Sequence, residues 1–562
     1  MNTSDVKNLI NALILGADNM GQDTIVIKSN NVWHITEEMV RDSVKDNEGI
    51  KVLYHEFTPD VMHEAYEPFL QWIKEIYEES GEESPEEFME KCQVYALHRE
   101  MLCEYIRRGK CVRKEPIIMG EREYDLKRLM MSITSILQYA AGRGKVLIVL
   151  ERIHLAGYST IQYLNSIINN NELEQISLLC TYDSTVGIQG YMNGIWDEFI
   201  KKVEEKNVGI AMYSDNEDSM YTEYEKNYFV LDFDNFEQYI DKIYTMIHTL
   251  ALEQALYYLG DIYHKIKIDK VYVSPALEVR YFELYAFAYL YAGKYQSSLM
   301  ICDNIKNIGI ESDAVDFNCN YAMCMAQLYL GQGVSAMMLA KKCKQIAEKM
   351  NDEYRVFIAR LLIVIVHLKG FTTVLIDMDG VKSFVDDEFT AEVERRGFYN
   401  HLAYIYIYAY EQSKEYYVGE YPERNLKYFK KGLEIIKRNE NDKFLMDAYR
   451  KCAMLYSVVG NIDEVDRNYK KCIDVLRRLN GKAEEANIYN GLGYNRMVRE
   501  DFEQANIYYN QALEIFYKLN EPEMVSETFY NMSINSLMAE DYKKCCICIT
   551  AAIQILDNYG VY

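Results

Sequence analysis

Three short signatures decide the fold of this chain: Gly460-Asn461-Ile462, Glu500-Asp501-Phe502 and Glu540-Asp541-Tyr542. They follow one another at intervals of 40 residues, and each lies between two amphipathic stretches. A small or slender residue stands three positions after each signature, at Val465, Ala505 and Cys545. A fixed period of this length predicts stacked helical hairpins.

The middle repeat shows how such a hairpin packs. Tyr489 and Gly493 lie on one face of the predicted first helix, and Ala505 and Tyr509 lie on one face of the second. The small residues allow the two helices to approach closely, while the tyrosines fill the space between layers. This pattern resembles the tetratricopeptide repeat, in the longer MalT-like form of large bacterial regulators.

Earlier units extend the predicted solenoid toward the N-terminus. Gly293-Lys294-Tyr295 and Gly331-Gln332-Gly333 have the character of further turns, and Tyr421–Gly432 resembles another unit. Phe371–Glu388 interrupts the rhythm as a distorted or inserted unit. We therefore predict an all-α superhelical solenoid over residues 251–562, with six or seven hairpins around a concave groove.

The N-terminal half has a different pattern. Four apolar segments predict buried strands separated by helices: Thr24–Ile27, Lys51–Tyr54, Lys145–Glu151 and Ile176–Thr181. Strands that are apolar throughout predict a parallel sheet covered on both faces. Ser84 and Pro85 predict the start of a helix that reaches Arg108. Residues 1–250 are thus expected to form an α/β domain.

Composition restricts the partners and the compartment. The 562 residues are too many for a single core, and the net charge of −25 argues against direct nucleic-acid binding. The apolar runs are too short to span a membrane, and the thirteen cysteines predict a reducing cytoplasm. No His or Cys spacing predicts a metal site, since Cys545 and Cys548 lack a second pair. Self-association is left open.

The segment Leu147–Thr160 (LIVLERIHLAGYST) resembles the second phosphate-site motif of STAND-class P-loop ATPases, whose domain is AAA-like and is often joined to tetratricopeptide repeats. Six residues match the motif: Glu151, Ile153, His154, Ala156, Ser159 and Thr160. Arg152 replaces the second acid and Gly157 replaces an Asp. Tyr228–Ile247 resembles the strand and helix that close such domains.

The resemblance places a phosphate-binding loop directly after the first strand. Such a loop requires glycines, a lysine and a Ser or Thr. From Ser29 onward only Thr36 fits, because Ile35 stands at the lysine position and His34 at a glycine position, next to the bulky Trp33. We therefore expect a degenerate nucleotide site at Ser29, His34, Ile35, Thr36, Glu151 and Arg152, with no cofactor, no catalytic residue and no enzymatic activity.

Three functions are consistent with this organisation. The leading hypothesis is a non-catalytic scaffold or regulatory protein that binds a protein or peptide in its repeat groove, with Tyr449, Tyr489 and Asn490 as groove contacts; the same residues could instead pack helix on helix. A divergent nucleotide-binding STAND-type signalling ATPase is one alternative. A relative of transcription regulators that acts through a partner is the other.

Overall fold

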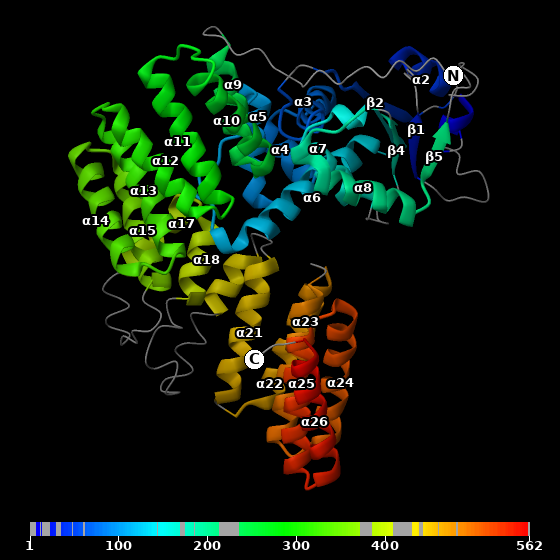
Figure 1. Ribbon diagram of the computed structural model, residues 1–562, viewed down its shortest axis with the longest axis vertical. Helices are drawn as coiled ribbons and strands as arrows, with labels where there is room; N and C mark the ends of the chain where they lie inside the picture. Colours follow the sequence, from blue (N-terminus) through cyan, green and yellow to red (C-terminus); the bar gives the residue numbers. More distant parts are fainter. Residues whose placement is uncertain are drawn as a thin grey trace. The chain divides into compact units, whose positions relative to one another are not determined.

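The computed structural model describes residues 7–11, 13, 23–29, 35–45, 47, 49–59, 62–142, 144–168, 175–184, 186–212, 235–370, 385–408, 430–437, 442–458, 460–478 and 481–559 of the chain. It divides into two compact units, Met1–Val366 and His367–Tyr562. The first unit combines a sheet with helical hairpins, and the second is helical over its described residues (Figure 1). The predicted domain boundary at residues 250 and 251 falls inside the first unit, between two helices.

The described strands of the first unit form one parallel sheet of five, with the order β2-β3-β4-β1-β5. The strands are β1 (Thr24–Ser29), β2 (Ile50–Glu56), β3 (Lys145–Glu151), β4 (Ile176–Asp183) and β5 (Gly209–Met212). The parallel sheet and its first four strands are confirmed. β5 was not predicted, because four residues at the edge of a sheet carry almost no periodic signal. The strand expected near Tyr228 lies outside the described residues.

Both faces of the sheet are covered. Ile25, Val149 and Leu179 belong to a buried cluster that includes Val40 and Val44 of helix α2 (Glu37–Val44). The alternate residues of the same strands, such as Val26, Ile148 and Leu178, are buried as well. Burial of successive residues explains why these strands are apolar throughout.

One predicted helix is wrong. The single helix expected from Pro85 to Arg108 is two helices, α4 (Pro85–Lys91) and α5 (Ala96–Arg108). Ser84 caps the first helix as expected, by accepting a hydrogen bond from the Glu87 N–H at 3.2 Å. Gln93 has a left-handed φ of 56°, and the Val94 N–H bonds the Met89 carbonyl, which closes α4 in the manner of a Schellman motif.

Further helices of the α/β part lie between the strands. Helices α3 (Phe69–Ser80) and α6 (Arg122–Ala141) lie between β2 and β3 in the chain. Two more helices follow β3 and β4, namely α7 (Tyr158–Ile168) and α8 (Asn193–Glu205). Figure 1 shows α3, α6, α7 and α8 beside the sheet.

Helical hairpins complete the first unit (Figure 1). The helices in order are α9 (Phe236–His248), α10 (Leu252–Lys267), α11 (Pro275–Tyr291), α12 (Tyr295–Ile308), α13 (Asp313–Tyr329), α14 (Gly333–Lys349) and α15 (Glu353–Gly370), the last of which crosses the boundary of the units at Val366. The predicted turns between α11 and α12 and between α13 and α14 are confirmed. Gly293 and Gly331 each adopt a φ of 78° there, a conformation that glycine adopts without steric cost.

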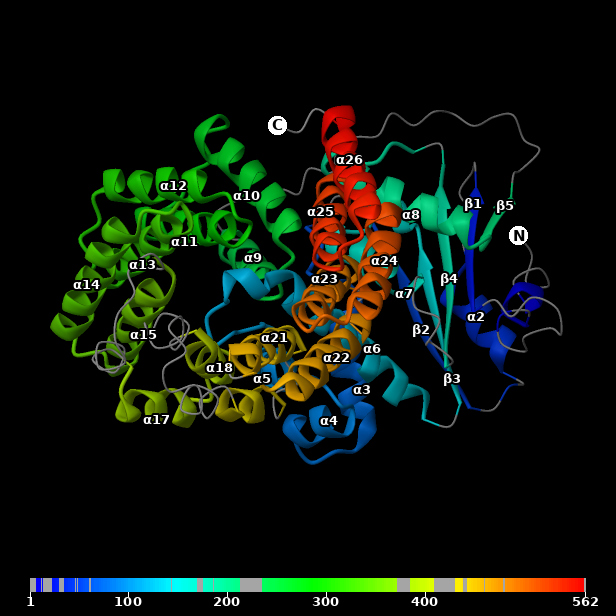
Figure 2. The same ribbon diagram turned by 90° about the horizontal axis from the view of Figure 1, so that it is seen from below.

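The second unit contains the three repeats that the signatures predicted. Its helices are α17 (Asp387–Arg395), α18 (Tyr399–Tyr408), α21 (Asp442–Val458), α22 (Ile462–Arg478), α23 (Lys482–Val498), α24 (Phe502–Leu519), α25 (Pro522–Met538) and α26 (Tyr542–Tyr559). Figures 1 and 2 both show α21 to α26 side by side as successive hairpins. Most of Phe371–Glu388 and most of Tyr421–Gly432 lie outside the described residues.

The structure gives a physical reason for the signatures. Their first residues, Gly460, Glu500 and Glu540, all adopt left-handed φ values, of 74°, 63° and 59°. The second residue caps the following helix, as when Asp541 accepts the Lys544 N–H at 3.0 Å. The sequence period of 40 residues therefore reflects the same turn and helix cap in each hairpin.

The two helices of the middle hairpin, α23 and α24, pack closely. A Cβ atom added to Gly493 would lie 2.6 Å from the ring of Tyr509, which is fully buried. The predicted roles of a small residue on one helix and a tyrosine on its partner are thus confirmed for this hairpin. No helix of the described ranges combines the length and apolarity that crossing a bilayer requires.

Candidate functional site

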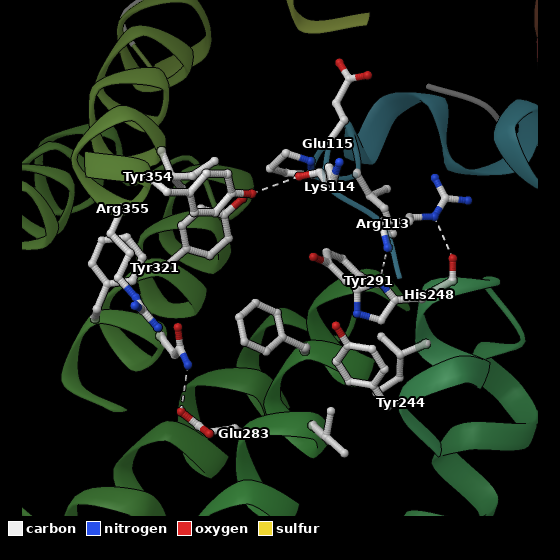
Figure 3. Close-up of a pocket in the computed structure, with 18 of the residues that line it drawn as sticks. Arg113, Lys114, Glu115, Tyr244, His248, Glu283, Tyr291, Tyr321, Tyr354 and Arg355 are labelled. Carbon is white, nitrogen blue, oxygen red and sulfur yellow. Dashed lines mark hydrogen bonds between the residues drawn. The ribbon is translucent and has the colours of Figure 1, made fainter. Parts of the chain in front are cut away.

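A cavity of about 490 Å³ lies in the first unit, between the segment 113–117 and the first helical hairpins (Figure 3). The segment 113–117 joins α5 to the region before α6. The remaining walls come from α9, α11, α13 and α15. The principal lining residues are Arg113, Lys114, Tyr244, His248, Arg280, Glu283, Phe287, Tyr291, Asn318, Tyr321, Tyr354, Arg355 and Ile358.

Helical spacing brings the aromatic walls together. Phe287 and Tyr291 are four residues apart on α11, so their side chains share one face of the helix. The Phe287 ring centre lies 5.9 Å from that of Tyr291 and 6.1 Å from that of Tyr321 on α13. Aromatic rings at these separations form a large contact surface with polar tips, which is typical of recognition sites.

The segment 113–117 is fixed by polar contacts to the hairpins. The Arg113 N–H donates to Nδ1 of His248 at 3.0 Å, and its Nε donates to the His248 carbonyl at 2.6 Å. The hydroxyl of Tyr354 donates to the Lys114 carbonyl at 3.0 Å. Burial lowers the pKa of His248 to about 3, so its ring is neutral and can accept a hydrogen bond. The segment therefore forms a stable wall of the cavity.

The arginines of the cavity have acidic partners, whereas one of its carboxylates, Glu283, has a neutral one. Arg113 makes a two-point ion pair with Asp125 at 2.6 and 3.1 Å, and Arg280 pairs with Asp241 at 2.8 Å. Glu283, in contrast, accepts a hydrogen bond from the Asn318 amide at 2.9 Å. Burial raises the pKa of Glu283, because desolvation penalises its charged form.

The position that the resemblance assigns to a degenerate nucleotide site is also in this unit. Ile35 is 1% exposed and belongs to the buried cluster that the strands form with α2, together with Ile27 and Val149. Its N–H donates to Glu151 at 2.7 Å, and the hydroxyl of Tyr54 donates to the same carboxylate at 3.1 Å. Glu151 has no exposed surface. The acid that the resemblance assigns to the phosphate site thus binds protein groups.

The other positions of that site have structural contacts. Thr36 caps α2 by accepting the Met39 N–H at 3.4 Å, and Ser29 donates to the Tyr182 carbonyl at 3.3 Å. Arg152 has a left-handed φ of 61° and lies 3.7 Å from Glu56. His34 and Trp33 lie outside the described residues. Of these positions, Ile35 contacts Glu151 directly, and Thr36 follows Ile35 in the chain as the cap of α2.

The matching Ser and Thr of the motif join the sheet domain to α10. Ser159 accepts the Tyr66 N–H and donates to the side-chain oxygen of Gln254, both at 2.8 Å. Thr160 donates to the Glu67 carbonyl at 2.7 Å. These buried bonds hold the start of α7 against the first hairpin helix.

The predicted groove contacts lie in the second unit. Tyr449 and Tyr489 are both buried, and the Tyr489 hydroxyl accepts a hydrogen bond from Arg477 at 3.1 Å. Asn490 is half-buried and donates to Thr528 at 3.0 Å. These contacts are those of helix packing. No cluster of three His, Cys, Asp or Glu side chains within the described ranges could hold a metal ion.

The cavity near α11 was not predicted from the sequence. The sequence pattern that corresponds to the cavity is the recurrence of aromatic residues on helices α11, α13 and α15, at Phe287, Tyr321 and Tyr354. The same residue types also fill helix interfaces, so the sequence does not distinguish the two roles. The segment 113–117 is distant in sequence from these helices, and no local pattern in it predicts that it packs against them.

Glu151 provides a test of the buried acid. Burial raises the pKa of Glu151 to about 7, so the folded protein holds a proton that the unfolded chain releases above about pH 4.5. The contribution of Glu151 to the free energy of unfolding therefore falls as the pH rises from about 4.5 through 7. Glu151→Gln removes this dependence. We expect its stability relative to the wild type to rise by about 2 kcal/mol between pH 5 and pH 8 in urea denaturation.

The matched control is Glu87→Gln, which changes an exposed carboxylate. It should follow the wild type over the same pH range. If Glu151→Gln also follows the wild type, the carboxyl is not buried as described.

Comparison with known proteins gives a fold. No protein-family model matches the chain, and no curated protein matches it. Among solved structures, a Signal Transduction ATPase with Numerous Domains (STAND) protein with a tetratricopeptide repeat sensor, PH0952 from Pyrococcus horikoshii, is 11% identical with a TM-score of 0.52; the match covers 100% of this chain and 96% of that one.

Two other structures match parts of the chain. The apo form of RapI is 13% identical over 57% of this chain and 86% of its own, with a TM-score of 0.46. The apo form of the quorum sensor NprR from B. thuringiensis is 12% identical over 65% of this chain and 93% of its own, with a TM-score of 0.33. Of these three structures, PH0952 has a TM-score above 0.5, and at 11% identity it shows the fold alone. The resemblance is therefore confirmed as a fold: a STAND-like α/β domain followed by tetratricopeptide-type hairpins.

Proposed function

We propose that the chain is a non-catalytic scaffold or regulatory protein that binds a segment of a protein or peptide in the cavity between segment 113–117 and helices α9, α11, α13 and α15. The cavity itself carries the proposal. Its volume of about 490 Å³ lies within the usual range for ligand sites, and aromatic walls with a few fixed polar groups are typical of such sites. Tyr354 at its rim is 44% exposed and accessible to a partner.

A peptide fits the construction of the cavity. The walls come from successive hairpins, so an extended chain can contact α11, α13 and α15 in turn. Polar groups such as the Asn318 amide and the Tyr354 hydroxyl can orient a backbone or a side chain. Rigid tyrosines provide contact area at a small cost in conformational entropy.

The absence of catalysis is part of the proposal. Phosphoryl transfer requires positioned charge around the phosphates and a metal ion. At the corresponding place Ile35 lies in the core, and Glu151 accepts hydrogen bonds from Ile35 and Tyr54. These contacts support a platform that does not hydrolyse ATP. The alternative is a divergent signalling ATPase. Titration of the chain with ATP and Mg²⁺ distinguishes the two, because the alternative requires nucleotide binding.

The charge and the cysteines support a further part of the proposal. The chain has a net charge of −25, which opposes direct binding to nucleic acid. Its thirteen cysteines are unpaired thiols, and eleven of them are buried. We propose a cytoplasmic protein on this basis, because unpaired thiols persist in a reducing compartment.

Selection from a phage-displayed library of random dodecapeptides tests the binding site. We expect the full-length chain to select peptides, and Phe287→Ala and Tyr321→Ala to weaken their binding by about 10-fold or more, because each change removes aromatic contact area from the cavity. The affinity is measured by fluorescence polarisation with the selected peptides.

Tyr517→Ala is the control, since it removes an exposed tyrosine from α24. It should leave the affinity within about two-fold. Peptides that bind all three variants equally would contradict the assignment of the site, provided that circular dichroism shows each variant folded.

A further inference from the structure

Glu283 differs from the cationic residues around it. Arg280 pairs with Asp241 at 2.8 Å and Glu237 at 3.2 Å, and Arg355 pairs with Asp352. Among the residues that the structure describes, Glu283 forms no ion pair and has a hydrogen bond from Asn318 at 2.9 Å. The cations of the cavity thus already have acidic partners, whereas this carboxylate has a neutral one.

Two layers of side chains lie next to one another on this wall. Glu283 and Phe287 are one turn apart on α11, and Asn318 and Tyr321 are one turn apart on α13. The carboxylate and the amide make one layer, and the two rings, 6.1 Å apart, make the next. Figure 3 shows Glu283 and Tyr321 on neighbouring helices along the cavity.

We propose that the ligand of this cavity presents a cationic group, the side chain of a lysine or arginine in a peptide, to the Glu283 carboxylate beside the rings of Phe287 and Tyr321. This inference rests on the proposed function and specifies its ligand. A carboxylate gives a charge-assisted hydrogen bond to an ammonium or guanidinium group, and aromatic faces attract the same cations.

The electrostatics favour a cation over an anion. Burial makes the charged form of Glu283 costly, and the Asn318 hydrogen bond and the charges of Arg355 and Arg280 offset only part of that cost, since the pKa stays raised. A bound cation offsets more of it, whereas an anionic ligand adds a like charge. The net charge of −25 also attracts basic peptides over long distances. A metal ion is a poor alternative, because one carboxylate among aromatic rings provides too few ligands.

The test uses the random dodecapeptide library on the full-length chain. We expect the wild type to select peptides that share a Lys or Arg, and Glu283→Gln to weaken those peptides by about 10-fold, because the amide keeps the size and the Asn318 contact but removes the charge. Replacing the shared basic residue by norleucine should weaken wild-type binding by a similar factor. Glu278→Gln on the same helix, outside the cavity, should change the affinity less than two-fold.

The outcomes separate this inference from the proposed function. Peptides that lack a basic residue, depend on Phe287 and Tyr321, and bind Glu283→Gln as tightly as the wild type would overturn the cationic ligand while supporting the site. Failure of the wild type to select any peptide that depends on Phe287 or Tyr321 would overturn the proposed function and this inference together.

Discussion

Ala505→Arg is expected to destabilise the C-terminal hairpins by about 4 kcal/mol, because it forces a charge into a fully buried contact. Ala505 lies on α24 one turn before Tyr509, whose ring packs against Gly493 of α23. The two helices approach too closely there for a long side chain. The arginine must either stay buried without a partner or push the helices apart.

Hydrogen exchange of peptides from α23 to α26 measures this effect within the second unit, and urea denaturation measures it for the whole chain. Gln511→Arg is the matched control, since it places the same charge on an exposed position of the same helix. The control should change stability by less than about 0.5 kcal/mol. Unchanged exchange in Ala505→Arg would show that the helix faces of the repeat are assigned incorrectly.

Gly157→Asp introduces the acid that the similar STAND motif has at the matching position, and we expect it to destabilise the first unit by about 3 kcal/mol. A Cβ atom on Gly157 would lie 2.7 to 2.9 Å from the end of the Gln254 side chain. Gln254 is fully buried and cannot move freely. It accepts from Ser159 at 2.8 Å and donates to the His63 carbonyl at 2.9 Å.

Gly187→Asp is the control, because a Cβ atom there meets no atom within 4 Å. The double variant Gly157→Asp with Gln254→Ala should lose less stability than the sum of the two single changes, since the second removes the clash. Strict additivity in urea denaturation would contradict direct contact between the two positions.

The sequence predicts the regular part of the fold well. Apolar runs such as Lys145–Glu151 predict the strands, because a sheet covered on both faces requires apolar residues at successive positions. The signatures at intervals of 40 residues predict the hairpins, because the turn and the helix cap occur at the same position in each repeat. The break at Gln93 was missed, since a left-handed residue without glycine has no distinct local signal.

The candidate site was predicted less well, for a physical reason. Ile35 follows β1 and Glu151 ends β3, so both residues lie at the carboxyl edge of the parallel sheet, and the resemblance pointed to both of them. The cavity depends instead on long-range contacts, such as those of Arg113 with His248 and of Lys114 with Tyr354. Local periodicity describes each helix but not the distant segment that packs against it.

In the proposed function, Ile35 and Tyr54 bind Glu151 at the position that the resemblance assigns to a phosphate site, so no nucleotide binds there. Thermal denaturation of the full-length chain with increasing ATP and Mg²⁺ tests it most directly, because a ligand at about 100 times its dissociation constant adds about 2.7 kcal/mol of stability. We predict no change in Tm up to millimolar ATP for either the wild type or Glu151→Gln. A saturable rise in the Tm of the wild type that is lost in Glu151→Gln would contradict the account.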